Sequence, residues 1–427
     1  MNAGDVELIS KSILKPSSPT PQTHKTLKLS FFDQLVPPFY VPIIFFYPAP
    51  TKTSDAAHIS HRLKQSFSHA LSLFPALAGK IDPENPAAVQ CSDAGARFTE
   101  TRVHARLSDA IKDPKMENLI KYLPANPHSA IHEDSLLAVQ INFFNCGGIA
   151  LGICSSHQVT DGSSLVSFIL SWAEICLRGQ GQNRKFPEFD LARHFPPRDP
   201  SDPGFSQSIY FKKENLVTKR LVFDREKLAA LRRAAAAGKV KVNHPTRVEL
   251  VSAYIWKNII EIGRAKNIQL SSAWHVVNLR PRVTSCELEN VFGNCIMKKY
   301  IYSEGGEPEF RQLVGKMGNG LREIDEEYVL RAGKGGYLDD LSKYFDLVGK
   351  GEIETCGFSS WCRFPVYDVD FGWGKPEWVC PASCPEKNFS FMFGAKDGEG
   401  IELWSNMRES SYMYLENKFK LLGKEEI

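Results

Sequence analysis

Residues Leu136–Gly179 read LLAVQINFFNCGGIALGICSSHQVTDGSSLVSFILSWAEICLRG, and this stretch decides the fold of the chain. Apolar residues alternate with their neighbours over 137–143 and again over 149–153, and NCGG between the two runs supplies turn residues. The apolar residues that follow recur instead at helical spacing, with Asp161 and Ser163 as candidate N-caps. The stretch therefore predicts a β-hairpin followed directly by a helix.

The rest of the chain predicts a mixed α/β protein with two domains of similar size. Its 427 residues exceed one ordinary core, and residues 178–215 are rich in glycine, proline and charge without a lasting period. Beyond them, VTKRLVF (217–223) predicts a strand and DREKLAALRRAAAAG (224–238) a helix. We therefore expect a first domain over 1–190, a crossover over 191–215 and a second domain over 216–427.

Composition and charge exclude several classes of protein. A net charge of +3 provides no polyanion-binding surface, so no nucleic-acid partner is expected. The beginning of the chain lacks the basic-then-apolar pattern of a secretory signal. The apolar segment FYVPIIFFYPAP (39–50) is shorter than the about 20 residues that span a bilayer, so it predicts a buried strand and no membrane anchor. Ten cysteines form no dense disulfide framework, which favours the reducing cytosol.

The turn between the hairpin and the helix carries His157, followed by Asp161 and Gly162. A histidine here presents its side chain at the end of a sheet, where sites of α/β proteins commonly form. A neutral imidazole is basic at pH 7, so His157 could take the proton from an alcohol or amine that attacks an activated acyl group. A structural turn that contains a histidine is the alternative.

Three other chemistries fit this turn less well. A metal site needs a third and usually a fourth ligand, and no second cluster of His, Asp or Glu accompanies the pair. A serine hydrolase needs a G-x-S-x-G elbow, which the sequence lacks. Cys154 precedes His157 by three residues and is a conceivable nucleophile, but its apolar context favours core packing.

A second constellation is YDVDFGWGKPEW, residues 367–378, in which two glycines flank a tryptophan. The pattern is typical of a tight, aromatic turn. Just before it, GFSSWCRFPVY (357–367) carries serines, a tryptophan and Arg363. Earlier, VVNLRPRV (276–283) predicts a strand on which Asn278, Arg280 and Arg282 alternate.

Together, HxxxDG as HQVTDG (157–162) and an intact DFGWG (370–374) resemble the plant BAHD acyltransferases, which use coenzyme A thioesters. The resemblance covers nearly the whole chain, because LKQSFSHALSLFPALAGKI (63–81), NLRPR, FGN and SSWCR also occur in the expected order. It is strongest to the vinorine synthase-like branch of alkaloid and terpenoid O-acetyltransferases. The resemblance implies two chloramphenicol acetyltransferase-like domains with a solvent channel between them.

The resemblance also implies roles for single residues. His157 would be the general base in the channel, Asp161 would fix its loop through a salt bridge with an arginine, and Asp370 would pair with Arg280. The expected catalytic-motif residues are His157, Asp161 and Asp370, and the expected structural supports are Gly162, Arg280, Gly372, Trp373 and Gly374. The residues expected to contact CoA are Ser359, Ser360, Trp361 and Arg363. Indole or backbone N–H groups of SSW or of the DFGWG turn are candidate donors to the oxyanion.

The expected activity is transfer of acetyl from acetyl-CoA to a hydroxyl of a plant specialised metabolite, without an acyl-enzyme. The expected partners are acyl-CoA and a small-molecule alcohol, with no permanently bound cofactor and no metal. The protein is expected to be a monomer. The alternatives are an N-acyltransferase, a longer or aromatic acyl donor on the same scaffold, and a non-catalytic binding protein that keeps the pocket.

Overall fold

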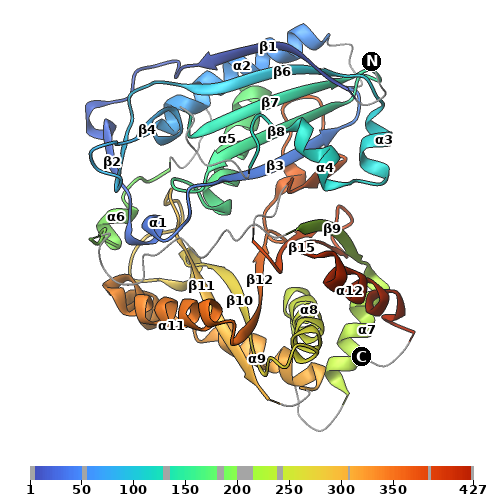
Figure 1. The fold of residues 1–427 in the computed structure, drawn as a ribbon. Helices are drawn as coiled ribbons and strands as arrows, with labels where there is room; N and C mark the ends of the chain where they lie inside the picture. The colour runs from blue at the N-terminus through green and yellow to red at the C-terminus, as the bar shows by residue number, and fades with distance from the viewer. Residues whose placement is uncertain are drawn as a thin grey trace. The chain divides into compact units, whose positions relative to one another are not determined.

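The computed structural model describes residues 5–50, 55–127, 135–179, 187–199, 215–237, 244–305, 308–382 and 386–424. These residues fold as two compact units, each built on a six-stranded sheet with helices (Figure 1), which confirms the mixed α/β class with two sheet-containing domains. The first unit contains the described residues up to 199 together with 285–295 and 364–382, and the second contains the remainder. The expected division at 191–215 differs from this one, because two segments from the second half of the chain join the first unit.

The sheet of the first unit has the strand order β1-β6-β7-β8-β3-β13. The strands are β1 (Val6–Leu14), β6 (Ala96–Val103), β7 (Leu137–Phe144), β8 (Ile149–Ser156), β3 (Tyr40–Tyr47) and β13 (Trp378–Cys380). The hairpin prediction is confirmed, because β7 and β8 pair antiparallel around the NCGG turn. Every residue of β3 is buried, as expected for the apolar segment that contains it.

Two long helices, α2 (Ala56–Leu73) and α5 (Gly162–Arg178), pack against the same face of this sheet (Figure 1). Phe67 of α2 contacts Phe98 of β6 and Trp172 of α5, with ring centroids 5.9 and 4.9 Å apart. The Trp172 indole donates a hydrogen bond to Ser66 Oγ at 3.0 Å. The shorter helices of the unit are α1 (Phe31–Gln34), α3 (Leu107–Lys112), α4 (Met116–Leu119) and α6 (Leu191–His194).

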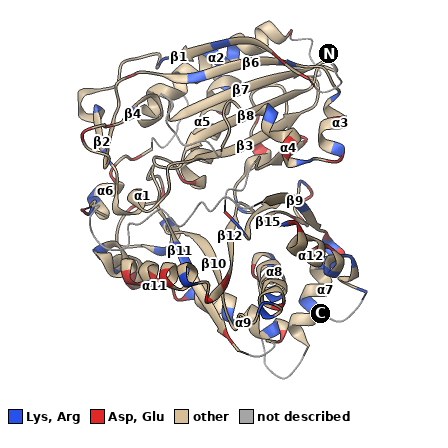
Figure 2. Ribbon diagram, in the orientation of Figure 1, with Lys and Arg blue, Asp and Glu red and all other residues tan. Residues whose placement is uncertain are grey.

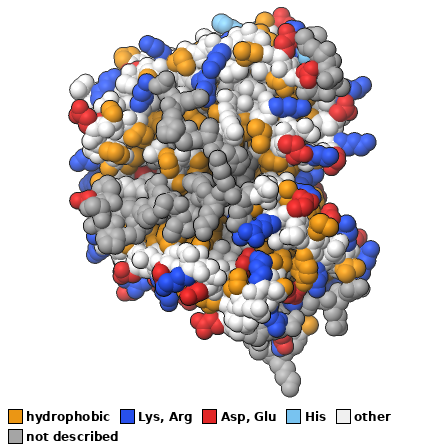
Figure 3. All heavy atoms as spheres, in the orientation of Figure 1, with side chains coloured by type: hydrophobic (Ala, Val, Ile, Leu, Met, Phe, Trp, Pro, Cys, Tyr) orange, Lys and Arg blue, Asp and Glu red, His pale blue; other side chains and the backbone are white. Residues whose placement is uncertain are grey.

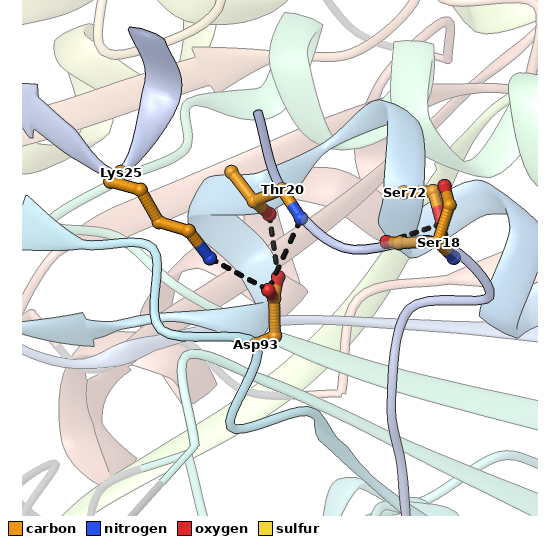
Figure 4. Close-up of polar contacts among 5 residues, drawn as sticks. All are labelled: Ser18, Thr20, Lys25, Ser72 and Asp93. Atoms are coloured by element: carbon orange, nitrogen blue, oxygen red, sulfur yellow. Dashed lines mark hydrogen bonds and ion pairs between the residues drawn. The ribbon is translucent and has the colours of Figure 1, made fainter. Parts of the chain in front are cut away.

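The segment between β1 and α1 is pinned to the body of the first unit by polar side chains (Figure 4). The Asp93 carboxylate accepts hydrogen bonds from the backbone and hydroxyl of Thr20 and from Lys25, and the backbone N–H of Ser18 donates to Ser72 Oγ. The segment leads into a three-stranded sheet of the order β2-β5-β4. Its strands are β2 (Thr26–Lys28), β5 (Ala88–Gln90) and β4 (Lys80–Ile81).

The sheet of the second unit has the order β11-β10-β12-β14-β15-β9. The strands are β11 (Ile296–Glu304), β10 (Leu270–Asn278), β12 (Ile353–Ser360), β14 (Phe389–Gly394), β15 (Ile401–Arg408) and β9 (Leu216–Phe223). The helices are α7 (Arg225–Ala236), α8 (Arg247–Arg264), α9 (Phe310–Arg322), α10 (Glu326–Arg331), α11 (Tyr337–Lys350) and α12 (Glu409–Leu421). The central helix α8 begins with a capping box, Thr246 with Glu249, and packs against β10, where the Trp256 indole donates to Ser271.

The predicted strand over NLRPR is wrong beyond its first residue. Strand β10 ends at Asn278, and Arg280–Arg282 form a 3-10 turn. Pro281 has no N–H to extend the ladder, and Asn278 Oδ1 instead accepts from the backbone N–H of Arg280 at 3.1 Å and from its Nη1 at 3.2 Å. Arg280 therefore lies near Asn278 because the chain turns, and not because side chains alternate on a strand.

The charged residues of both units lie mainly on helices and loops, while the strands carry few (Figure 2). Lys and Arg are interspersed with Asp and Glu on the face drawn in Figure 3, in keeping with the small net charge. Within the described ranges, none of the helices combines the length and the apolar character that a bilayer crossing requires.

Candidate active site

His157 begins the turn that joins β8 to α5. Strand β8 is paired on both sides, with β7 and β3, so the place where it ends is fixed by the sheet. The backbone N–H of His157 donates to the carbonyl of Phe39 at 2.8 Å. The Thr160 hydroxyl closes the turn by donating to the Ser156 carbonyl at 2.9 Å. His157 is thus presented by a rigid junction.

The half-buried imidazole of His157 has a defined tautomer. Its Nδ1 lies 3.0 Å from the carbonyl oxygen of Thr160. A carbonyl can only accept a hydrogen bond, so Nδ1 carries the proton and Nε2 of the neutral ring carries the lone pair. The ring also packs edge-on against Phe39, with centroids 5.1 Å apart. This arrangement equips Nε2 to accept a proton.

Asp161 is fully buried and binds backbone groups with both carboxylate oxygens. Oδ1 accepts from the N–H of Ser164 at 2.8 Å and caps helix α5, and Oδ2 accepts from the N–H of Cys295 at 3.1 Å. The capping prediction is confirmed for Asp161. Its expected salt bridge with an arginine stays a prediction.

The loop that contains FGN (292–294) belongs to the first unit although it comes from the second half of the sequence, and it packs beside the His157 turn. Three successive backbone N–H groups of this loop donate to side chains of the first unit: those of Gly293, Asn294 and Cys295, to Ser164, Asp33 and Asp161 respectively. The side-chain amide of Asn294 also donates to the His157 carbonyl at 2.7 Å. Sequence reasoning did not single out Asp33 or Asn294, although the spacing of Ser30 and Asp33 is that of a capping box.

The DFGWG residues form a turn on the first unit. Asp370 Oδ1 accepts from the backbone N–H groups of Gly372 and Gly374, at 2.7 and 3.0 Å. The rings of Phe371 and Trp373 stack with centroids 5.5 Å apart, and both lie edge-on to Tyr47. The motif thus shapes and anchors a turn at the end of β3.

The structure does not bring the DFGWG turn to His157. In the register of β3 with β8, Tyr40 lies opposite Ser156 and Tyr47 lies opposite Ile149. Seven residues of strand separate the two ends of β3, which is about 23 Å at roughly 3.3 Å per residue. The N–H groups of Gly372 and Gly374 are already bound by Asp370. The supply of oxyanion donors by this turn stays a prediction. The pairing of Asp370 with Arg280 stays a prediction.

Cys154, three residues before His157, is not suited to covalent catalysis. Burial raises the pKa of its thiol to about 12. The thiolate is the nucleophilic form, and it is suppressed at this position at neutral pH. The Ser155 hydroxyl is hydrogen-bonded to Thr160 Oγ1. Within the described part of the chain, no three His, Cys, Asp or Glu side chains gather in a way that could hold a metal ion.

The residues expected to contact CoA lie in the second unit, at and after the end of β12. Ser359 and Ser360 are half-buried and Arg363 is exposed. Trp361 is buried and stacks on Phe393, with centroids 5.4 Å apart. Their contact with CoA stays a prediction.

A family model described as the Transferase family matches residues 4–422. The chain is 38% identical over 426 residues to stemmadenine O-acetyltransferase of Catharanthus roseus, which covers 98% of this chain and 97% of that protein. It is 31% identical over 421 residues to limonoid 1-O-acetyltransferase of Citrus sinensis, covering 94% and 93%. Vinorine synthase of Rauvolfia serpentina is 37% identical over 423 residues, covering 97% and 96%. A crystal structure of vinorine synthase superposes with a TM-score of 0.84 over 98% of both chains, at 35% identity.

Proposed function

The chain belongs to the Transferase family, the BAHD acyltransferases, and on that premise we propose that it transfers acetyl from acetyl-CoA to a hydroxyl group of a plant alkaloid or terpenoid. The relatives that carry O-acetyltransferase in their names act on stemmadenine and on limonoids, which supports this class of acceptor. We expect the enzyme to act as a monomer in the cytosol, without a resident metal.

His157 acts as the general base. Its Nε2 removes the hydroxyl proton of the acceptor while the alcohol oxygen attacks the thioester carbonyl carbon of acetyl-CoA. The tetrahedral intermediate collapses as the carbon–sulfur bond breaks, and the imidazolium returns its proton to the sulfur of CoA. An acetyl ester and free CoA leave, and His157 is again neutral.

The observation that carries this proposal is the hydrogen bond between His157 Nδ1 and the Thr160 carbonyl. It holds the imidazole in the tautomer with a basic Nε2, and it does so with a neutral backbone group. A buried carboxylate in that place would stabilise the protonated ring. Because the base must release its proton in the second step, a neutral carbonyl, which stabilises the protonated ring less than a carboxylate would, suits the reaction better.

Thiol release with acetyl-CoA tests the activity. The purified protein is incubated with acetyl-CoA and a panel of indole alkaloid alcohols, terpenoid alcohols and matched amines, and free CoA and product mass are measured. We expect CoA release that depends on an alcohol and a product heavier by one acetyl group. Transfer only to amines, or only from a longer acyl-CoA, would replace the acceptor or donor assignment.

Intact-mass measurement tests the direct mechanism. The acyl group arrives activated as a thioester, and the thiol that precedes His157, that of Cys154, is buried with a raised pKa. Incubation with acetyl-CoA alone, followed by denaturation, should give no stoichiometric gain of one acetyl group. An adduct on Cys154 or on a serine would require a two-step mechanism.

A further inference from the structure

Two buried side chains outside the HxxxDG motif, Asp33 and Asn294, form a chain of hydrogen bonds that ends on the backbone of the base. Asp33 is 4% exposed and Asn294 is fully buried. Asp33 Oδ1 accepts from the side-chain Nδ2 of Asn294 at 2.9 Å and from its backbone N–H at 2.7 Å. The same Nδ2 donates to the His157 carbonyl oxygen at 2.7 Å.

The Asp33 carboxylate fixes the direction in which the Asn294 amide points. Oδ1 accepts from the Asn294 N–H groups, while Oδ2 accepts from the backbone N–H and hydroxyl of Ser30, at 2.7 and 2.6 Å. A carboxylate only accepts, so the amide must present Nδ2 and not Oδ1 to it. The second hydrogen on Nδ2 is then directed at His157.

The consequence is that His157 is held at three points. Its backbone N–H is bound by Phe39, its ring Nδ1 by Thr160 and its carbonyl by Asn294. The first two bonds come from residues adjacent to the turn in the sheet or the sequence. The third comes from a loop 137 residues away along the chain. Without it, the peptide between His157 and Gln158 loses the bond from Asn294, and the imidazole can tilt with that peptide.

We propose that Asn294, oriented by Asp33, is a positioning residue for the general base. It acts through the His157 peptide and does not itself touch the reacting atoms. The proposal rests on the proposed role of His157. Misplacement of a catalytic group by about 1 Å can cost on the order of 10²-fold in rate, so the effect belongs in kcat.

The competing explanation is that Asp33 merely caps helix α1, where it forms a capping box with Ser30. The variant Ser30→Ala separates the two explanations, because it removes the cap while Asp33 and Asn294 stay in place. The variants Asp33→Asn and Asn294→Ala interrupt the chain to His157. Both carboxylate oxygens of Asp33 accept hydrogen bonds, one from Asn294 and the other from Ser30. In Asp33→Asn an NH₂ group replaces one of these oxygens and can no longer accept, so the variant loses the bonds either to Asn294 or to Ser30.

Steady-state kinetics with acetyl-CoA and the best alcohol is the first measurement. We expect Asn294→Ala to lose on the order of 10²-fold in kcat, with KM for acetyl-CoA within about twofold of wild type. Asp33→Asn should fall between wild type and Asn294→Ala, and the double variant should be no worse than Asn294→Ala alone, because both act on one chain of bonds. Ser30→Ala should keep kcat within about twofold. Equal losses in Ser30→Ala and Asp33→Asn, or multiplied losses in the double variant, would overturn the proposal.

A spectroscopic measurement tests the same point without catalysis. In protein labelled with ¹⁵N-histidine, the Nδ1–H signal of His157 is identified by its loss in His157→Gln. We expect this signal to shift or broaden in Asn294→Ala and to stay in place in Ser30→Ala. If wild type acetylates no alcohol, the proposed function fails while this result still decides the positioning role. An unchanged Nδ1–H signal in Asn294→Ala would refute that role.

Discussion

At the scale of single residues, the proposed base, His157, is shaped by the group that its Nδ1 binds. The carboxylate four positions after His157 is not the partner of Nδ1, which binds the Thr160 carbonyl. Asp161 is instead occupied by the backbone N–H groups of Ser164 and Cys295. The motif therefore combines the proposed base, His157, and a residue that binds the surrounding backbone, Asp161, in one turn.

Replacing His157 by alanine should abolish most of the turnover and leave the fold intact. Removal of a general base typically costs about 10²–10⁴-fold in rate. The side chain is half-buried, and its replacement removes one hydrogen bond and one edge-on ring contact with Phe39, so the unfolding midpoint should change little. The measurement is kcat together with thermal unfolding of the variant. A variant that retains a third of the wild-type rate would contradict the assignment of the base.

His275, on β10 of the second unit, should make stability depend on pH. It is buried against Ser252 and Phe358, and burial lowers its pKa from 6.5 to about 3. Below pH 6.5 the imidazole of His275 binds a proton in the unfolded chain but stays neutral in the folded state. The folded state is therefore fully stabilised above pH 6.5 and loses this stabilisation as the pH falls toward 3. Between pH 7 and 5 this group should account for a loss of about 2 kcal/mol in the free energy of unfolding of its unit.

The check on His275 is urea unfolding at pH 7 and pH 5 for wild type and His275→Gln. The difference between the two pH values should shrink by about 2 kcal/mol in the variant. His61→Gln, an exposed position on α2, is the control and should leave the difference unchanged. An unchanged difference in His275→Gln would show that another group titrates.

At the scale of elements, the first turn of α5 is a junction between two parts of the chain. Asp161→Asn should destabilise it, because an amide can cap the helix with its oxygen but then presents a donor to the N–H of Cys295. Leaving such a buried group unsatisfied costs about 1–3 kcal/mol. Asp224→Asn is the matched control: Asp224 caps α7 at an exposed position and should change stability by only a few tenths of a kcal/mol. Chemical unfolding of both variants gives the comparison, and equal effects would contradict the role of Cys295.

The DFGWG turn offers a second comparison within one element. Gly372 and Gly374 both have a left-handed backbone, with φ of +106° and +108°, so alanine is strained at either position by about 1–3 kcal/mol. A Cβ on Gly372 would in addition approach Arg62 Nη2 to 2.8 Å, whereas one on Gly374 meets nothing within 4 Å. Arg62 donates to the carbonyl of Cys176 at 2.7 Å, and its displacement would release that bond.

Gly372→Ala should therefore lower the thermal unfolding midpoint more than Gly374→Ala. Both variants should keep the KM of the folded enzyme for the alcohol, because the turn lies at the far end of β3 from His157. A larger loss in Gly374→Ala would show that backbone strain alone governs this turn.

At the scale of the whole molecule, the first unit is not a continuous stretch of chain. Strand β13 pairs with β3, with Trp378 stacked on Phe46 at 5.2 Å, and the loop over 285–295 satisfies Asp33, Asp161 and Ser164. Both segments come from the second half of the sequence. The unit can therefore be completed only after most of the chain has been made.

A chain truncated to residues 1–215 should not fold cooperatively. It lacks β13, which pairs with β3, and the buried carboxylates of Asp33 and Asp161 lose the N–H groups of the loop over 285–295. Thermal unfolding followed by circular dichroism should show no sharp transition, and co-expression of residues 216–427 should restore one. A truncated chain that unfolds with the midpoint of the full-length protein would contradict this division of the chain.

The hairpin of β7 and β8, the N-cap of α5 at Asp161 and the capping box of α8 could be predicted from the order of the residues, because each depends on periodicity or spacing within about 20 residues. The role of His157 as general base stays a proposal. Prediction from the sequence failed at Arg280, where a local bond to Asn278 and the following proline end the strand. Three features became visible only in the folded chain: the bond of His157 Nδ1 to the Thr160 carbonyl, the position of Asp370 beyond the other end of β3, and the bonds that join Asp33 to Asn294 and Asn294 to the His157 carbonyl. Asp33 and Asn294 are 261 residues apart. Such contacts form only when distant segments of the chain fold together, and the sequence around one partner contains no pattern that identifies the other.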